Sequence, residues 1–429
     1  MNLDEVKAET VRLLGEKRFI AMMSVAISLL VLVYTELSGN WGDLDHYYVN
    51  AGDVLSGKIP YSDMVFEYPP LSLLFMIIPR VLSWDLSSFH YLCAIQTYVF
   101  IAIGAHFLYK IADEFIGSRW KAGFVILCLL IFGSYFVIAR NDVYPAVMVL
   151  IGLWFYLRKD YTLAFILVAV AAMTKMYPAI FIIPMLMPIL YRRQWNVALK
   201  AILAVVAVGL LVELPFIIAD PSTAFAYLSY HSDRGIQVES VASGFFMLYS
   251  LVIPSDITVL FGYGSDNLCG AGPDALAPWM NILTIVAIAS FLIVMALKAS
   301  KASVSDERML RLSALMCLAV LMVFITFSKV YSAQYYIWIV MMLPMAYLVH
   351  SDRESECRLL AISLLFGIFT MVSYLSYNSL GLVQLNAAAV MAVVMKNLFH
   401  IMLMIEIFRL CWFETEASDN QSCIGDSEA

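Results

Sequence analysis

The sequence predicts an all-α polytopic membrane protein, and three observations support this prediction. Of the 429 residues, 62% are hydrophobic and only 14% are charged, and the mean hydropathy is +0.84. About twelve apolar runs follow one another at lengths typical of membrane-crossing helices. The basic residues of the short loops between these runs then fall on one side. Residues 1–412 are therefore expected to form a single integral-membrane domain.

The elements follow in chain order. Residues 1–18 are charged and expected to be helical; their mixed sign differs from a cleaved signal peptide, so the first apolar run is expected to be a retained anchor. Two apolar pieces, near 70–83 and 241–253, are too short to span comfortably and are expected to be interfacial or re-entrant. The expected crossings lie near 19–37, 88–109, 121–139, 143–157, 161–175, 178–191, 197–219, 276–297, 309–328, 333–349, 358–377 and 387–410.

Basic residues in the short loops predict the orientation, because cytoplasmic loops carry an excess of Lys and Arg. With twelve crossings both termini are cytoplasmic, and the opposite side receives two long outer loops, 38–87 and 220–275. Counting either short piece as a full crossing would scatter the basic residues over both sides. The residues that gather on the predicted cytoplasmic side are Lys17, Arg18, Lys110, Arg119, Lys121, Arg158, Lys159, Arg192, Arg193, Lys298, Lys301, Arg353 and Arg358.

Composition also excludes several classes of partner and site. Residues 413–429 are polar and acidic and are expected to form a disordered cytoplasmic tail. The formal net charge of −7 argues against nucleic acid as a partner. Seven cysteines lie mostly inside apolar runs without a close pair, so neither a disulfide framework nor structural zinc is expected.

The first outer loop concentrates carboxylates and aromatic side chains. Asp43 and Asp45 follow the first apolar run. Glycine and proline impose turns on the rest of the loop, which favours a built loop over a tether. An acidic, solvated loop beside an interfacial aromatic belt is the alternative. The further polar and aromatic residues of this loop are Tyr47, Tyr61, Glu67 and Tyr68.

Isolated charges occur at four other places on the same outer side. Charges this near hydrocarbon cost several kcal/mol unless they are paired or hydrated. A surface ion pair or a snorkelling lysine is the ordinary alternative. Together with the carboxylates of the first outer loop, these charges predict an outer vestibule in which a carboxylate activates a hydroxyl and cations hold a phosphate leaving group. These residues are Arg140 and Asp142; Lys175; His231, Arg234, Gln237 and Glu239; and Lys329, Tyr331, Gln334 and Tyr335.

Short motifs in this order resemble glycosyltransferase family 87, whose members are similar to polyprenyl-phosphate mannosyltransferases. In the first outer loop they are Asp43 with Tyr47, "GKIPY" at 57–61 and "YPP" at 68–70. Farther along are "KMYP" at 175–178, "RGIQVES" at 234–240 and "SAQYYIW" at 332–338. The resemblance thus covers most of the chain.

The resemblance implies a GT-C bundle of about twelve transmembrane helices with its active site on the extracytoplasmic face. It implies a polyprenyl or dolichyl monophosphate hexose donor, most often mannose, and an acceptor hydroxyl on a glycan, glycolipid or glycoprotein. Transfer would be a single inverting displacement. The base is the early aspartate of the first outer loop, a position that matches Asp43, while Asp45 stays open as a rival.

The remaining site residues follow from the resemblance and from their charge. No cofactor is expected, although Asp43, Asp45 and Asp142 could together hold a divalent metal. Lys175, Arg234, Lys329 and Arg140 would hold the donor phosphate. Substrate-binding residues would be Tyr47, Tyr61, Glu67, Tyr68, Asp142, His231, Gln237, Glu239, Gln334 and Tyr335.

Two other functions remain open. A transporter or lipid flippase predicts polar residues near the bilayer midplane and access from both faces. A catalytically silent scaffold would tolerate Asp43→Asn. The gathering of charges at one face favours the enzyme, and a prokaryotic plasma membrane is the expected location.

Overall fold

All twelve predicted apolar runs are helical in the computed structural model, which describes residues 3–232, 234–302, 304–349 and 352–416. Within these ranges, seven helices are long and apolar enough to cross a membrane. The chain is a predominantly helical integral membrane protein. The helices of the runs are α2 (Lys17–Ser38), α5 (Leu86–Ile111), α6 (Arg119–Phe132) with α7 (Ser134–Ala139), α8 (Val143–Leu157), α9 (Tyr161–Thr174), α10 (Ile182–Tyr191), α11 (Trp195–Ala219), α14 (Ala271–Ala302), α15 (Asp306–Phe327), α16 (Tyr336–Met342), α17 (Arg353–Ser379) and α18 (Ala387–Glu416).

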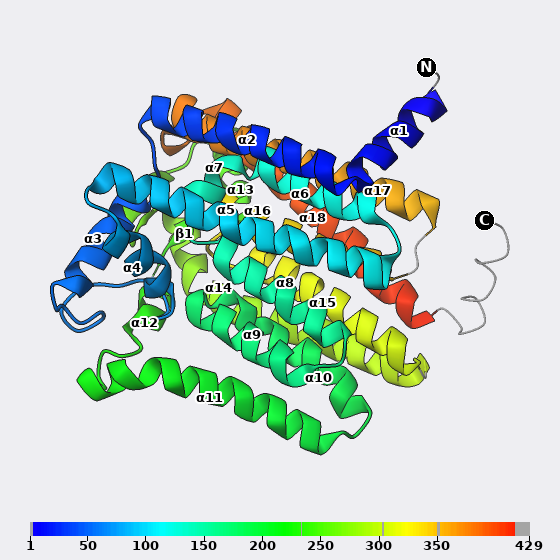
Figure 1. The fold of residues 1–429 in the computed structure, drawn as a ribbon. Coiled ribbons are helices and arrows are strands. Elements are labelled where there is room, and N and C mark those ends of the chain that lie inside the picture. Colours follow the sequence, from blue (N-terminus) through cyan, green and yellow to red (C-terminus); the bar gives the residue numbers. More distant parts are fainter. Residues whose placement is uncertain (1–2, 233, 303, 350–351, 417–429) are drawn as a thin grey trace.

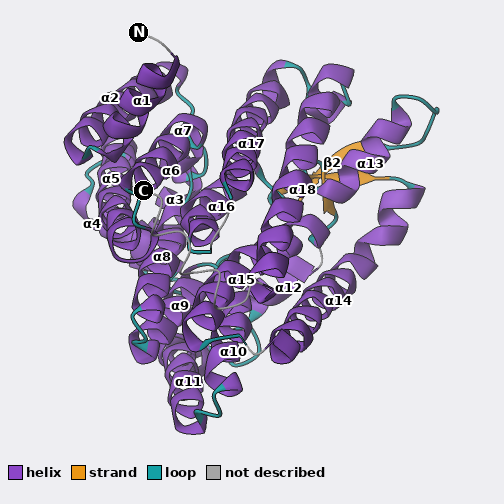
Figure 2. Cartoon of the chain, turned by 90° about the vertical axis from the view of Figure 1, so that its right-hand side faces the viewer, coloured by secondary structure: helices purple, strands orange, loops and turns teal. Residues whose placement is uncertain are grey.

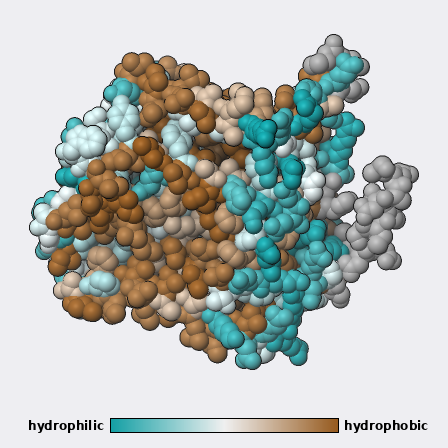
Figure 3. All heavy atoms as spheres, in the orientation of Figure 1, coloured by the Kyte–Doolittle hydropathy of each residue, from teal (hydrophilic) through white to brown (hydrophobic). Residues whose placement is uncertain are grey.

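The helices pack around α15. In the most apolar stretch of α15, 78% of the residues are buried, against 11% in α2 and in α11. Figure 2 shows α5, α6, α8 and α9 on one side of α15, and α14, α17 and α18 on the other. Apolar surface covers the middle of the molecule in Figure 3, with hydrophilic residues along the edge that carries α1. Exposed apolar side chains of this kind suit contact with lipid.

The two long loops form their own structure at the opposite end of the bundle from α1 (Leu3–Gly15) (Figure 1). The first contains α3 (Leu44–Leu55) and α4 (Ser72–Leu82), and the second contains α12 (Ala226–Ser232) and α13 (Val241–Ser250). The two short apolar pieces near 70–83 and 241–253 are thus the short helices α4 and α13. This end of the bundle is called the loop end below.

A small sheet in the second loop was not predicted. Strands β1 (Ile236–Gln237), β2 (Thr258–Gly262) and β3 (Ser265–Cys269) form an antiparallel sheet in the order β1-β3-β2. Tyr263 and Gly264 join β2 to β3 with φ of 52° and 67°. Positive φ at both central residues is typical of a type I′ hairpin turn, and Tyr-Gly is a weaker signal for such a turn than Asn-Gly.

The predicted tail starts too early. α18 continues to Glu416, so residues 413–416 are helical. Two ion pairs hold this end: Lys298 Nζ lies 2.8 Å from Glu416 Oε1, and Arg308 Nε lies 3.3 Å from Glu414 Oε1. Residues 417–429 of the predicted tail lie outside the described residues.

Candidate active site

A cavity of about 660 Å³ lies at the loop end, within the size range of small-molecule sites. Segments far apart in the sequence meet in its wall. Its polar lining residues include Asp43, His46, Glu67, Tyr68, Arg140, Lys175, Tyr230, Arg234, Gln237, Glu239, Asp266, Gln334, Tyr335, Tyr374 and Tyr377.

The backbone before α3 places Asp43 in this wall. Gly42 has φ of 63°, and a Cβ there would lie 2.6 Å from the Cβ of Ala139. The N–H of Asp43 donates to the carbonyl of Ala139 at 3.3 Å. The Asp43 carboxylate then forms an ion pair with Arg140, and the Tyr47 hydroxyl donates to it at 3.5 Å. Asp43 is therefore fixed in position yet partly open to the cavity.

Asp45 lies away from the cavity. Asp43 is the residue that precedes α3 and lines the cavity, whereas Asp45, in the first turn of α3, is absent from the lining. Asp45 Oδ1 is 2.7 Å from His90 Nε2, and its side chain is 67% exposed. The structure thus separates the two aspartates that the sequence leaves as rivals.

Lys175 faces the cavity with a buried counter-charge behind it. Its Nζ donates to Asp142 Oδ1 at 2.6 Å, and Trp338 Nε1 donates to the same oxygen at 2.7 Å. The Asp142 side chain is only 1% exposed. Arg140 and Asp142, two residues apart, therefore pair with different partners rather than with each other.

Arg234, Glu67 and Tyr230 converge above the β2–β3 hairpin. Arg234 donates to the carbonyl of Tyr263 from Nε at 2.9 Å and from Nη2 at 2.5 Å. A Cβ at Gly264 would meet Tyr230 Oη, Glu67 Oε2 and Arg234 Nη2 at 3.2–3.6 Å. Burial raises the pKa of Tyr230 to about 12, and the negative charge of Glu67 adds to this. The Tyr230 hydroxyl is thus neutral at physiological pH.

Gln237 joins β1 to the segment that leads into α16. Its Nε2 donates to Ser332 Oγ at 2.7 Å, and its Oε1 accepts from the Tyr331 N–H at 3.0 Å. Lys329 is buried in that segment, and its carbonyl accepts from the Gln237 N–H at 2.9 Å. Gln334 and Tyr335 line the cavity directly, whereas Lys329 is absent from the lining.

Other predicted residues occupy a second layer or a neighbouring hollow. Tyr47 is buried behind Asp43, with its hydroxyl 3.4 Å from that of Tyr68. Tyr61 donates to the Tyr68 carbonyl at 2.6 Å and lines an adjoining hollow of about 390 Å³. The side chain of His231 lies outside the described residues.

Several functional candidates escaped the sequence analysis. Asp266, on β3, lines the cavity and accepts a hydrogen bond from Tyr377 of α17. Lys396, in the middle of α18, is fully buried and forms an ion pair with Glu239. A lysine inside an apolar run is itself a signal of function, and this signal could have found Lys396.

The three aspartates that the sequence analysis named as possible ligands of a divalent metal do not share a site. Asp45 is directed to His90, and Asp142 to Lys175 and Trp338, so neither joins Asp43 as a ligand. Among the residues that the structure describes, no group of three or more His, Cys, Asp or Glu side chains converges in a way that could hold a metal ion.

Comparison with known proteins gives one family. Residues 66–328, more than half of the chain, match glycosyltransferase family 87. Among solved structures, ArnT from Cupriavidus metallidurans bound to undecaprenyl phosphate is similar over 92% of this chain and 77% of its own, at 16% identity and a TM-score of 0.48. Curated proteins showed no match.

Proposed function

The chain belongs to glycosyltransferase family 87, and we propose that it transfers a hexose from a polyprenyl monophosphate to an acceptor hydroxyl. Mannose is the hexose that we favour. The acceptor is a glycan, glycolipid or glycoprotein. The site lies at the loop end, which we assign to the extracytoplasmic face of a prokaryotic plasma membrane, with both chain termini in the cytoplasm.

One observation supports this proposal most directly: Asp43, one of four acidic residues in the lining, shares the cavity with three cations. Asp43 supplies the carboxylate, and Arg140, Lys175 and Arg234 supply the cations. A general base needs a carboxylate within reach of the acceptor hydroxyl. A phosphate leaving group needs cations where its charge develops.

The mechanism is a single inverting displacement. Asp43 accepts the proton of the acceptor hydroxyl while the acceptor oxygen bonds to the anomeric carbon of the sugar. The bond between that carbon and the phosphate oxygen breaks, and its electron pair leaves with the polyprenyl phosphate. The phosphate needs no proton, because Lys175, Arg234 and Arg140 balance its charge. No divalent metal is required in this scheme.

Arg140 connects the two halves of the reaction. In the structure it is paired with Asp43, so the carboxylate is occupied by the guanidinium. A donor phosphate in the cavity competes for the same guanidinium and releases Asp43 to act as base. Glu67, Tyr68, Gln334 and Tyr335 complete the substrate-binding wall.

The test is sugar transfer by the purified protein in lipid, from radiolabelled polyprenyl-phosphate mannose to a native membrane extract. Asp43→Asn should abolish transfer, whereas Asp45→Asn should retain it. Each variant must remain folded and still bind the donor. Added EDTA should leave the wild-type rate unchanged.

Two results would contradict the proposal. Retained transfer by Asp43→Asn would remove Asp43 as the base. A wild type that transfers no polyprenyl-phosphate sugar, but moves lipid or solute across the vesicle wall, would replace the transferase with a transporter.

A further inference from the structure

A fully buried lysine stands in the middle of an apolar helix beside the cavity. Lys396 lies nine residues after Ala387, the first residue of α18, which is about 14 Å along the helix axis. Its side chain is 0% exposed. An ionisable group at such a position is costly and marks function more often than packing.

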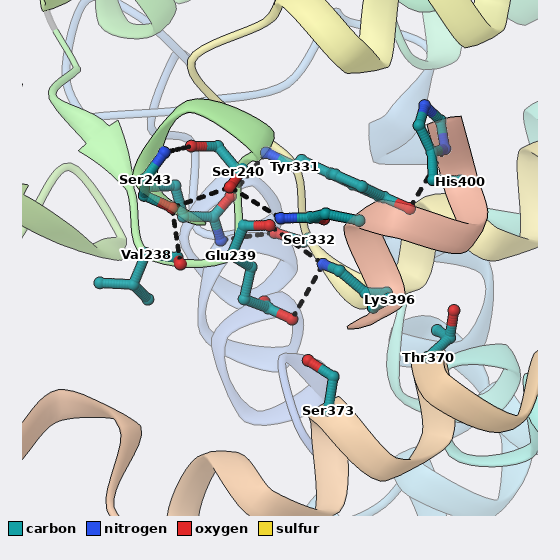
Figure 4. Close-up of polar contacts among 12 residues, drawn as sticks. Val238, Glu239, Ser240, Ser243, Tyr331, Ser332, Thr370, Ser373, Lys396 and His400 are labelled. Atoms are coloured by element: carbon teal, nitrogen blue, oxygen red, sulfur yellow. Dashed lines mark hydrogen bonds and ion pairs between the residues drawn. The ribbon is translucent and has the colours of Figure 1, made fainter. Parts of the chain in front are cut away.

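Lys396 contacts one residue of the second loop twice. Its Nζ is 3.6 Å from Glu239 Oε1 and donates to the main-chain carbonyl of Glu239 at 3.1 Å. The same ammonium lies 3.9 Å from the centre of the Tyr331 ring. Figure 4 shows Lys396 reaching from α18 toward Glu239. The lysine therefore holds both the backbone and the charge of this residue.

Neighbouring hydrogen bonds fix the turn that carries Glu239. Asn397 Nδ2 donates to the Ser240 carbonyl at 3.0 Å. Ser243 Oγ donates to the carbonyls of Val238 at 2.7 Å and Ser240 at 2.9 Å, as Figure 4 shows around β1 and α13. The carboxylate thus starts from a fixed backbone, which suits a binding group.

The Glu239 carboxylate retains capacity to accept hydrogen bonds. Its side chain is 8% exposed, yet it belongs to the cavity wall. The buried oxygen, Oε1, faces Lys396, so the acceptor sites that a ligand in the cavity can reach are those of Oε2. A buried carboxylate that is charge-balanced but short of donors is matched by a ligand with hydroxyl groups.

The position of Glu239 favours the donor sugar over the acceptor. It lies near enough to Arg140 for their charges to interact, and Arg140 is a proposed phosphate ligand. The sugar is attached directly to that phosphate. A bare carboxylate there would repel the phosphate, whereas a carboxylate neutralised by Lys396 would not.

We propose that Glu239 is a binding subsite for a hydroxyl of the transferred sugar and that Lys396 is the positioning residue that balances it. This inference rests on the proposed transferase function. It adds a determinant of sugar choice, because a site built to bond a hydroxyl rejects the analogue that lacks it.

The test measures kcat and KM with polyprenyl-phosphate mannose and with its 2-, 3-, 4- and 6-deoxy analogues. Wild type should discriminate at least tenfold against one analogue. Glu239→Gln and Lys396→Met should both lose that discrimination, and the double variant should lose no more than either. Lys396→Arg, which keeps the charge, should retain part of it.

Arg409→Met is the matched control, because Arg409 pairs with Glu406 at 2.8 Å on the same helix, near its other end. It should discriminate as wild type does. Transfer by wild type establishes the proposed function independently of any variant. If wild type transfers mannose but Glu239→Gln keeps full discrimination, the subsite is wrong, even if Lys396→Met fails to fold. Equal loss in Arg409→Met would also overturn it.

Discussion

Replacing Lys175 by methionine separates its structural role from its proposed catalytic role. The substitution removes the cation 2.6 Å from Asp142 and leaves a carboxylate that is 1% exposed without its counter-charge. Breaking a buried pair in this way costs about 3–5 kcal/mol. Trp338 still donates to Asp142 at 2.7 Å, and a hydrogen bond to a charged group contributes about 1.5–3 kcal/mol. Because this hydrogen bond remains, we expect Lys175→Met to lower the free energy of unfolding by about 3 kcal/mol, the lower end of the range for a broken pair.

A second substitution recovers the fold but not the chemistry. In Lys175→Met with Asp142→Asn, the buried charge is gone, and the free energy of unfolding should return to within about 1 kcal/mol of wild type. Transfer should stay about 10²–10³-fold below wild type in kcat, because a cation facing the leaving phosphate is still missing.

Unfolding in mixed micelles and sugar transfer in lipid measure the two quantities separately. The reasoning is refuted if Lys175→Met unfolds at the wild-type free energy, which would mean that Asp142 needs no counter-charge. It is equally refuted if the double variant regains wild-type kcat, because Lys175 would then serve the fold alone.

Three further predictions follow from the structure. Gly42→Ala should destabilise the fold by about 1–3 kcal/mol and reduce transfer, since φ is 63° and Ala139 is in the way; thermal unfolding and transfer check it. Trp338→Phe removes one donor to Asp142 and should cost about 1–3 kcal/mol in unfolding, without abolishing transfer. Asp85 caps α5, and its hydrogen bonds with Ser88 lower the pKa of Asp85. The stability that this carboxylate contributes is therefore present above its pKa in the unfolded chain and is lost as the pH falls through the lowered folded-state pKa. Asp85→Asn should flatten this pH dependence in acid unfolding.

The helices were predictable because length and hydropathy are local properties of the chain. Loop charges alone predicted that Asp43 and Lys175 lie on the same side of the membrane, and the structure places both in the wall of one cavity. The ion pairs could not be predicted in this way, because Arg140 pairs with Asp43, and Lys175 with Asp142, only once separate segments pack together. The sequence alone did not show whether Asp43 or Asp45 faces the cavity, because the directions of the two side chains depend on where α3 begins.

Of two features that the sequence analysis missed, one could have been predicted from the sequence and the other could not. Lys396 is the kind of intramembrane charge that marks a site, and its place inside an apolar run is visible in the sequence. The β2–β3 hairpin depends on a Tyr-Gly turn, whose positive φ values show only in three dimensions. Residues of the hairpin line the cavity directly, whereas Lys396 contacts the wall through Glu239.

The contact between Lys396 and Glu239 spans 157 residues, which has a consequence for biogenesis. Helices enter the membrane in order of synthesis, and domains with distant contacts complete their packing late. Glu239 emerges well before α18, so its turn lacks its anchor until α18 has inserted. A ribosome-bound chain that ends before α18 would therefore be expected to carry most of the cavity wall but no competent enzyme.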